Sequence, residues 1–259
     1  MRTKAYYLIL IFFLILPSVQ SQSKVNLFFK PSDSLNISRR NSVVISEAAL
    51  LSATMIGLET YWYSDYPQSK FHFINDNGDW QQLDKMGHVF TSYQLGIFGS
   101  DALKWSGASK KDQLIYGSTL GFVFLSAVEV LDGHSSNWGA SSGDIFANAT
   151  GTAICVSQEL LWNEQRIIPK FSFHTTQYAA LRPNVLGESF SEQMLKDYNG
   201  QTYWLSVNFH SFFKESTIPQ WLNVAVGYGA DGMIYSKTNS DSVFNYPNVT
   251  PFRQFYFSF

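Results

Sequence analysis

The hydrophobic pattern of this chain changes near residue 166, and that change limits the folds open to it. Before it, apolar residues run almost continuously through four segments, which is typical of helices. These segments are residues 40–63, 84–99, 111–132 and 142–162. After it, apolar and polar residues alternate, as in residues 203–209 and 222–228, which is typical of strands. The pattern predicts an α+β chain: a four-helix bundle of small-residue-rich helices, which could be membrane-embedded, followed by a short antiparallel sheet of three or four strands.

Residues 1–21 have the features of a signal peptide. Arg2 and Lys4 form a positive start, and an almost wholly apolar run follows at 6–16. That run is shorter than the ~20 residues that span a bilayer, which favours cleavage over an anchor. We therefore expect an exported protein of the bacterial cell envelope, either periplasmic or associated with the outer membrane. An inner-membrane location is the alternative.

Beyond the leader, the chain divides into a polar segment at 22–39, a helical domain at 40–165 and a β-rich extension at 166–259 that packs on the bundle. Segment 40–63 is so uniformly apolar that we expect a buried helix. The glycine-rich segment 227–232 follows a strand and precedes no helix, so we expect it to form a turn.

Composition excludes several classes of function. Only 15% of the residues are charged, against ~25% in ordinary soluble domains, and the formal net charge is −2. Nucleic-acid binding usually requires a basic surface, so no nucleic-acid partner is expected. Low charge and 17% aromatic residues favour membrane or envelope components as partners and leave protein partners unassigned. The single cysteine, Cys155, rules out an intrachain disulfide, and no cysteine near residue 21 can accept a lipid.

A few polar residues within the apolar helices carry the chemical information, because a buried charge is costly unless it is paired. The second helix contributes two such residues one turn apart. The third contributes two at its C-terminal end, where the helix dipole disfavours negative charge, and the fourth contributes two near its start. We expect them to form one inward-facing cluster of Asp84, His88, Glu129, Asp132, Asp144 and Asn148.

Three roles remain open for this cluster. In a structural network, Asp84 would cap its helix and His88 would bond to Glu129. Asp144 would then complete a capping box begun by Ser141. Alternatively, the cluster binds a ligand or a lipid head group. In the third role it holds a catalytic divalent metal, with candidate ligands or acid and base groups Asp84, His88, Glu129 and Asp144.

Three motifs resemble a known family: DKMGH at 84–88, EVLDG at 129–133 and SGDIFANATG at 142–151. They are similar to the uncharacterised YfiM-like envelope proteins and, more distantly, to VanZ-like membrane proteins. Segments 197–206 and 219–229 look like the C-terminal extension of the longer Bacteroidetes-type members. The resemblance implies a predicted periplasmic lipoprotein with no assigned reaction, although this chain lacks the lipid-accepting cysteine. It also implies a family polar core of Asp84, His88, Glu129, Asp144 and Asn148.

Together these observations predict an exported cell-envelope protein of uncharacterised role. We expect a membrane-associated structural or binding component with a buried Asp/His/Glu/Asn cluster. The alternative is a metal-assisted hydrolase acting on a lipid or cell-wall substrate. The sequence leaves open whether the protein is an enzyme, calls for no cofactor and names no metal.

Overall fold

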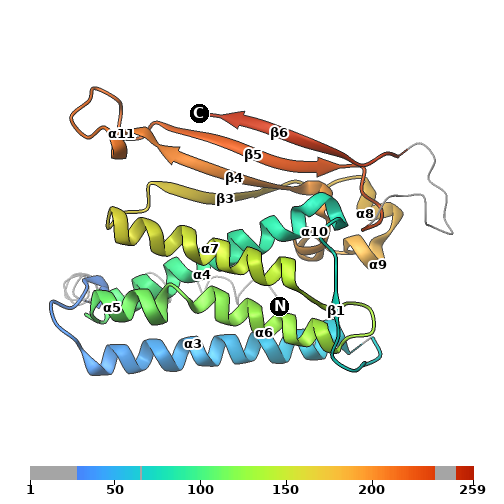
Figure 1. Cartoon of the computed structure of the whole chain (residues 1–259), viewed down its shortest axis with the longest axis horizontal. Coiled ribbons are helices and arrows are strands. Elements are labelled where there is room, and N and C mark those ends of the chain that lie inside the picture. Colours follow the sequence, from blue (N-terminus) through green and yellow to red (C-terminus); the bar gives the residue numbers. More distant parts are fainter. Residues whose placement is uncertain (1–27, 65, 237–248) are drawn as a thin grey trace, which may run out of the picture.

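The computed structural model describes residues 28–64, 66–236 and 249–259, and the expected leader lies outside this part. The fold is α+β, as predicted. Helices form one layer, and a four-stranded antiparallel sheet lies over α4 (Leu83–Trp105) and α7 (Ser142–Leu161) (Figure 1). Helix α3 (Ile37–Leu58) and strand β6 (Phe252–Ser258) lie on opposite sides of the molecule.

All four segments expected to be helical are helical. A π-helical turn at Glu59–Tyr63 extends α3. The third segment begins with a short helix, α5 (Lys110–Asp112), continues through a π-helical turn at Gln113–Gly117 and ends in α6 (Leu120–His134). Helices α4, α6 and α7 pack against one another, whereas α3 makes fewer contacts with α4. The four-helix bundle and its embedding in a membrane are therefore not confirmed.

Close approach between the three packed helices depends on small residues. A Cβ atom added at Gly121 of α6 would lie 2.3 Å from the carbonyl oxygen of Ser92 in α4. One added at Gly151 of α7 would lie 2.2 Å from the carbonyl oxygen of Val89. Both distances are far below van der Waals contact, so these glycines bring α6 and α7 directly against the α4 backbone.

The expectation that segment 40–63 is buried was wrong for α3. Within this helix only Val43 is buried, and its outward face exposes Val44, Ile45 and Ile56. An apolar composition predicts contact with an apolar neighbour, and within this chain that neighbour covers only one side of the helix. By length and composition, α3 and the segment 110–134 are the two described helices that could cross a membrane.

The sheet has the strand order β3-β4-β5-β6, with every neighbouring pair antiparallel. Its first three strands are β3 (Ile167–Phe173), β4 (Gln201–Asn208) and β5 (Asn223–Asp231). The expectation of a turn at 227–232 was wrong, because β5 continues to Asp231 and only Gly232 has a positive φ, of 77°. A Cβ atom at Gly227 would lie 2.7 Å from the Trp204 ring, so glycine here makes room for an aromatic side chain on the next strand.

Apart from the helix that follows β4, the remaining elements lie near the N-terminal end of α4 (Figure 1). A short parallel pair joins β1 (Phe73–Ile74) to β2 (Ala140–Ser141), and a 3-10 turn at Asp79–Gln82 leads into α4. Between β3 and β4 lie α8 (Tyr178–Leu181), α9 (Pro183–Leu186), α10 (Phe190–Lys196) and a 3-10 turn at Tyr198–Gly200, and α11 (Phe209–Phe212) follows β4. Helices and sheet share a core of Leu83, Tyr203, Ala230 and Met233.

Candidate functional site

The polar residues expected to form one cluster lie at neighbouring helix ends. Asp84 and His88 are in the first turns of α4, Glu129 is near the end of α6, and Asp144 and Asn148 are in the first turns of α7. The described structure brings the other four side chains around the His88 ring. The sixth expected residue, Asp132, instead accepts a 2.7 Å hydrogen bond from the Tyr63 hydroxyl.

Lys85 is the cation of this cluster, and the sequence analysis did not include it. Its ammonium lies 2.7 Å from Asp76 Oδ2, 3.0 Å from Asp84 Oδ2 and 2.8 Å from Asp144 Oδ1. The Lys85 side chain is only 13% exposed, so these pairs form largely away from water. The excess of carboxylates in the expected cluster was a signal that a cation was missing, because buried charges are normally paired.

Asp76 was also missed, because it lies in a loop and only the tertiary structure brings it to the helices. Its Oδ1 accepts a 2.6 Å hydrogen bond from the Ser141 hydroxyl. Ser141 in turn caps α7 by accepting from the Asp144 backbone N–H at 3.2 Å. The capping role expected for Ser141 is therefore present, while the Asp144 carboxylate pairs with Lys85.

His88 hydrogen-bonds to Asn148, whereas Glu129, its partner in the structural network considered above, makes only a longer ion-pair contact of 3.9 Å with Nε2. His88 Nδ1 lies 2.9 Å from Asn148 Oδ1, and with the amide in this orientation Nδ1 donates its proton to that oxygen. Glu129 Oε2 instead accepts the Ser141 backbone N–H at 2.8 Å. The Glu129 carboxylate is thus bonded to the backbone at Ser141, and the His88 ring is bonded to a side chain of α7.

The other ring nitrogen, His88 Nε2, faces three carboxylate oxygens. It lies 3.8 Å from Asp84 Oδ1, 3.8 Å from Asp144 Oδ1 and 3.9 Å from Glu129 Oε1. These separations exceed hydrogen-bond length. Nε2 therefore faces a space bordered by oxygens from three helices, and it presents a lone pair to that space only when the ring is neutral.

Burial and mutual repulsion shift the acid–base behaviour of the cluster. Burial raises the pKa of Glu129 to about 7 and that of Asp144 to about 6. Burial alone would lower the pKa of His88, but the facing carboxylates, Asp84 foremost, outweigh it and raise that pKa. These shifts reduce the negative charge of the site near neutral pH and favour a positive charge on His88.

A cavity of about 410 Å³ adjoins the cluster, and Asp84 and His88 line it. Tyr198, which precedes β4, donates a 2.9 Å hydrogen bond to Asp84 Oδ1 and lines the same cavity. Tyr198 was not found from the sequence, because 114 residues separate it from Asp84. The site is thus built by the helices and closed on one side by the segment before β4.

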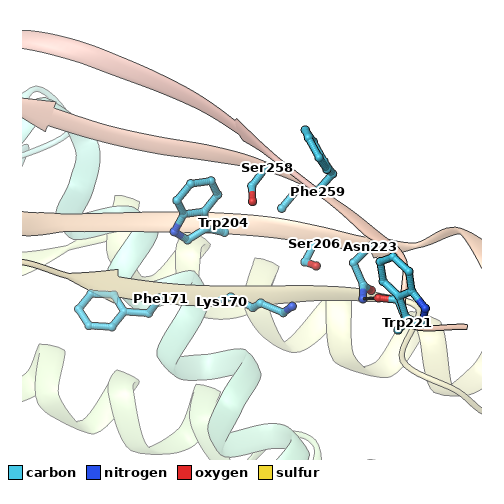
Figure 2. A pocket seen from close by; sticks show the side chains of 9 residues that line it. Lys170, Phe171, Trp204, Ser206, Trp221, Asn223, Ser258 and Phe259 are labelled. Atoms are coloured by element: carbon cyan, nitrogen blue, oxygen red, sulfur yellow. Dashed lines mark hydrogen bonds between the residues drawn. The ribbon is translucent and has the colours of Figure 1, made fainter. Parts of the chain in front are cut away.

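A second cavity of about 480 Å³ lies over the sheet, lined by Lys170, Trp204 and Trp221 among others (Figure 2). Lys170 and Trp204 are partners across β3 and β4, on the face opposite Tyr203, which packs toward α4. Among the described residues, no Asp, Glu or His side chain lines this cavity. Its chemistry is that of an aromatic surface and is separate from the polar cluster.

We expect Lys85→Met to lower the free energy of unfolding by about 3–5 kcal/mol, because it leaves buried carboxylates without their cation. Chemical denaturation measures this change. Lys110→Met is the matched control: its partner is Glu159, its side chain is 42% exposed, and its loss should cost about 1 kcal/mol or less. Equal effects of the two substitutions would contradict a structural role for the Lys85 network.

Stability should also depend on pH. An acid whose pKa is higher in the folded than in the unfolded chain takes up its proton more readily when folded, so lower pH favours folding. Glu129, with a pKa of about 7, and Asp144, with a pKa of about 6, both have this sign. We expect the melting temperature without added metal to rise by roughly 2–8 °C between about pH 8 and about pH 5.

Thermal melts across this range test the pH dependence. Glu129→Gln, which is neutral at every pH, should make the slope shallower. A melting temperature that falls with acidification, or a slope that Glu129→Gln leaves unchanged, would show that these carboxyl groups do not titrate as described.

Residues 73–159 match the family DUF2279, which is described as a predicted periplasmic lipoprotein. The match covers about a third of the chain and includes the cluster residues from 76 to 148. It does not support the more specific YfiM-like and VanZ-like resemblances. A search of curated proteins and one of solved structures each found no match.

The description of that family agrees with the export expected from the leader. The sequence nevertheless has one cysteine, Cys155, and it is buried in α7, where it cannot accept a lipid. The chain is an exported protein of the cell envelope that, over residues 73–159, is similar to an uncharacterised family of predicted periplasmic lipoproteins.

Proposed function

We propose that this protein is a membrane-associated binding component of the cell envelope and that its buried polar cluster binds a divalent cation. The observation that carries the proposal is the position of His88 Nε2, which lies 3.8–3.9 Å from carboxylate oxygens of Asp84, Asp144 and Glu129. Each oxygen comes from a side chain that the fold holds in place, so the arrangement exists before any ion arrives.

The separations fit a shared ion. Two ligand atoms on one Zn²⁺, each at 2.0–2.2 Å and at a tetrahedral angle, lie about 3.5 Å apart. The observed distances need to close by only a few tenths of an ångström. Ligand atoms of Asp84, His88 and Asp144 all lie within 4.8 Å of one another. Glu129 Oε1 lies 3.9 Å from His88 Nε2.

The surrounding residues suit the same ion. Asn148 accepts the Nδ1 proton of His88, and this is the arrangement that orients a metal-binding histidine with its Nε2 lone pair outward. Lys85 offsets only part of the negative charge of Asp76, Asp84, Asp144 and Glu129. A divalent cation would offset two of the three negative charges that remain when all four carboxylates are ionised. An imidazole with carboxylates favours Zn²⁺ or Mn²⁺ over Mg²⁺, which prefers oxygen ligands alone.

We expect one Zn²⁺ to bind per chain, and His88→Ala and Asp144→Asn to weaken binding by at least about tenfold. Isothermal titration calorimetry measures both affinity and stoichiometry. His174→Ala is the control, since His174 is exposed and lies outside the cluster. Thermal melts should accompany the titrations, because His88→Ala also removes the partner of buried Asn148. A wild-type protein that takes up no Zn²⁺, or a folded His88→Ala protein with unchanged affinity, would refute the proposal.

Membrane association is supported by helix α3. Its outward face is apolar, and Glu47 is the only charged residue between Arg40 and Glu59. A contiguous exposed apolar surface on a protein marks an interaction site. In an exported envelope protein, lipid is the apolar surface most readily available to it.

We expect the purified protein to float with phospholipid vesicles in a density gradient, and Ile45→Glu combined with Ile56→Glu to abolish flotation, because both side chains are exposed on α3. Phe257→Glu is the control, since Phe257 is equally exposed but lies on β6, across the molecule. Flotation lost in the control and kept in the α3 variant would place the lipid contact on the sheet instead.

A metal-assisted hydrolase is the second candidate, and Glu129 favours it. This buried acid has a pKa of about 7, which suits a general base beside a metal-bound water. If the protein with Zn²⁺ hydrolyses a p-nitrophenyl ester, Glu129→Gln should lower the rate by about 100-fold or more while Zn²⁺ still binds. Absence of turnover, or turnover that Glu129→Gln leaves unchanged, would leave the binding role as the function.

A further inference from the structure

The cavity beside the polar cluster has two chemically different parts. Asp84, His88 and Tyr198 form its polar end. The rest of its wall is mainly apolar and includes Phe90, Leu125, Phe171, Met194 and Leu195. At about 410 Å³, it falls within the range of ~300–1,000 Å³ typical of small-molecule sites.

The exposure of the wall residues shows where the cavity opens. Leu125 of α6 and Tyr203 of β4 are buried, so they form its inner wall. Leu195 of α10 is 64% exposed, so the opening lies on the α10 side. A molecule that enters past α10 would place its leading end against Asp84 and His88.

We propose that this cavity holds the hydrocarbon chain of an anionic amphiphile, whose carboxylate or phosphate head group lies at the His88 end. The inference rests on the proposed cation site. Three protein ligands leave a position open on a tetrahedral ion, and two of the three, Asp84 and His88, line the cavity. An anionic head group would complete the coordination there, whereas without the cation the carboxylates would repel it.

The apolar wall of the cavity favours a ligand with a hydrocarbon chain. Burial of a hydrocarbon chain against Phe90, Leu125 and Phe171 is favourable in proportion to the apolar area removed from water. A small hydrophilic anion would gain only the contact with the ion. The cavity therefore favours amphiphiles over small hydrophilic anions. An exported protein in contact with lipid would encounter such amphiphiles.

The experiment measures binding of cis-parinaric acid, a fluorescent fatty acid, to the purified protein with Zn²⁺ or with EDTA. Affinity should be at least about tenfold higher with Zn²⁺. Leu195→Glu, which places a charge at the opening, should weaken binding by about tenfold or more while calorimetry shows unchanged Zn²⁺ affinity. Trp221→Ala is the matched control, since Trp221 lines the cavity over the sheet (Figure 2), and it should bind like the wild type.

Displacement distinguishes the two head groups: lysophosphatidic acid carries a phosphate, and unlabelled palmitic acid carries a carboxylate. The more effective competitor identifies the natural class. Binding that Leu195→Glu leaves unchanged, or that Trp221→Ala abolishes, would overturn the assignment to this cavity. If Zn²⁺ does not bind but parinaric acid still binds in a Leu195-dependent way, the cation site fails and the chain-binding cavity stands. Binding of Zn²⁺ without any binding of parinaric acid overturns this inference and leaves the cation site intact.

Discussion

The structure around the site depends on Lys85, whose ammonium is shared by three carboxylates. Asp76 comes from the loop before α4, Asp84 from α4 itself and Asp144 from α7. Their burial would be strongly unfavourable without this cation, and the cation would be equally unfavourable without them. One shared ion pair network therefore joins the beginnings of two helices to a loop, at the point where His88 must be held.

The network that stabilises the helix ends also positions the side chains of the proposed cation site. Lys85 pairs with Asp144 through Oδ1, the same oxygen that faces His88 Nε2, and oxygens of Asp84 and Glu129 border the ring beside it. Burial raises the pKa of Glu129 to about 7, so negative charge at this position is costly unless a proton or another cation is present. The adjoining cavity, whose wall is mainly apolar, leads to Asp84 and His88. The proposed cation site therefore uses the same carboxylates that pair with Lys85 and stabilise the helix ends.

Much of the fold could be predicted because its signals are local. Helical and alternating patterns placed four helical segments and the strands that form one antiparallel sheet. Spacings of one helical turn also brought Asp84 with His88, and Asp144 with Asn148, into one expected cluster. Two predictions about the fold were wrong because they depended on which residues pack beside the segment. Apolar α3 is covered by the rest of the chain on one side only. Gly227 lies within a strand, where the missing side chain makes room for the Trp204 ring.

Element types, the expected export and the grouping of Asp84, His88, Glu129, Asp144 and Asn148 followed from the sequence alone, since each depends on composition or on short spacing. The tertiary structure alone decided which charges pair. Asp76 and Tyr198 reach the cluster from a loop and from a segment 114 residues beyond Asp84, and no periodicity links them to α4. His88 bonds to Asn148 and not to Glu129 for the same reason: packing of α4 against α7 sets the distance between their side chains, and that distance is a property of the folded chain.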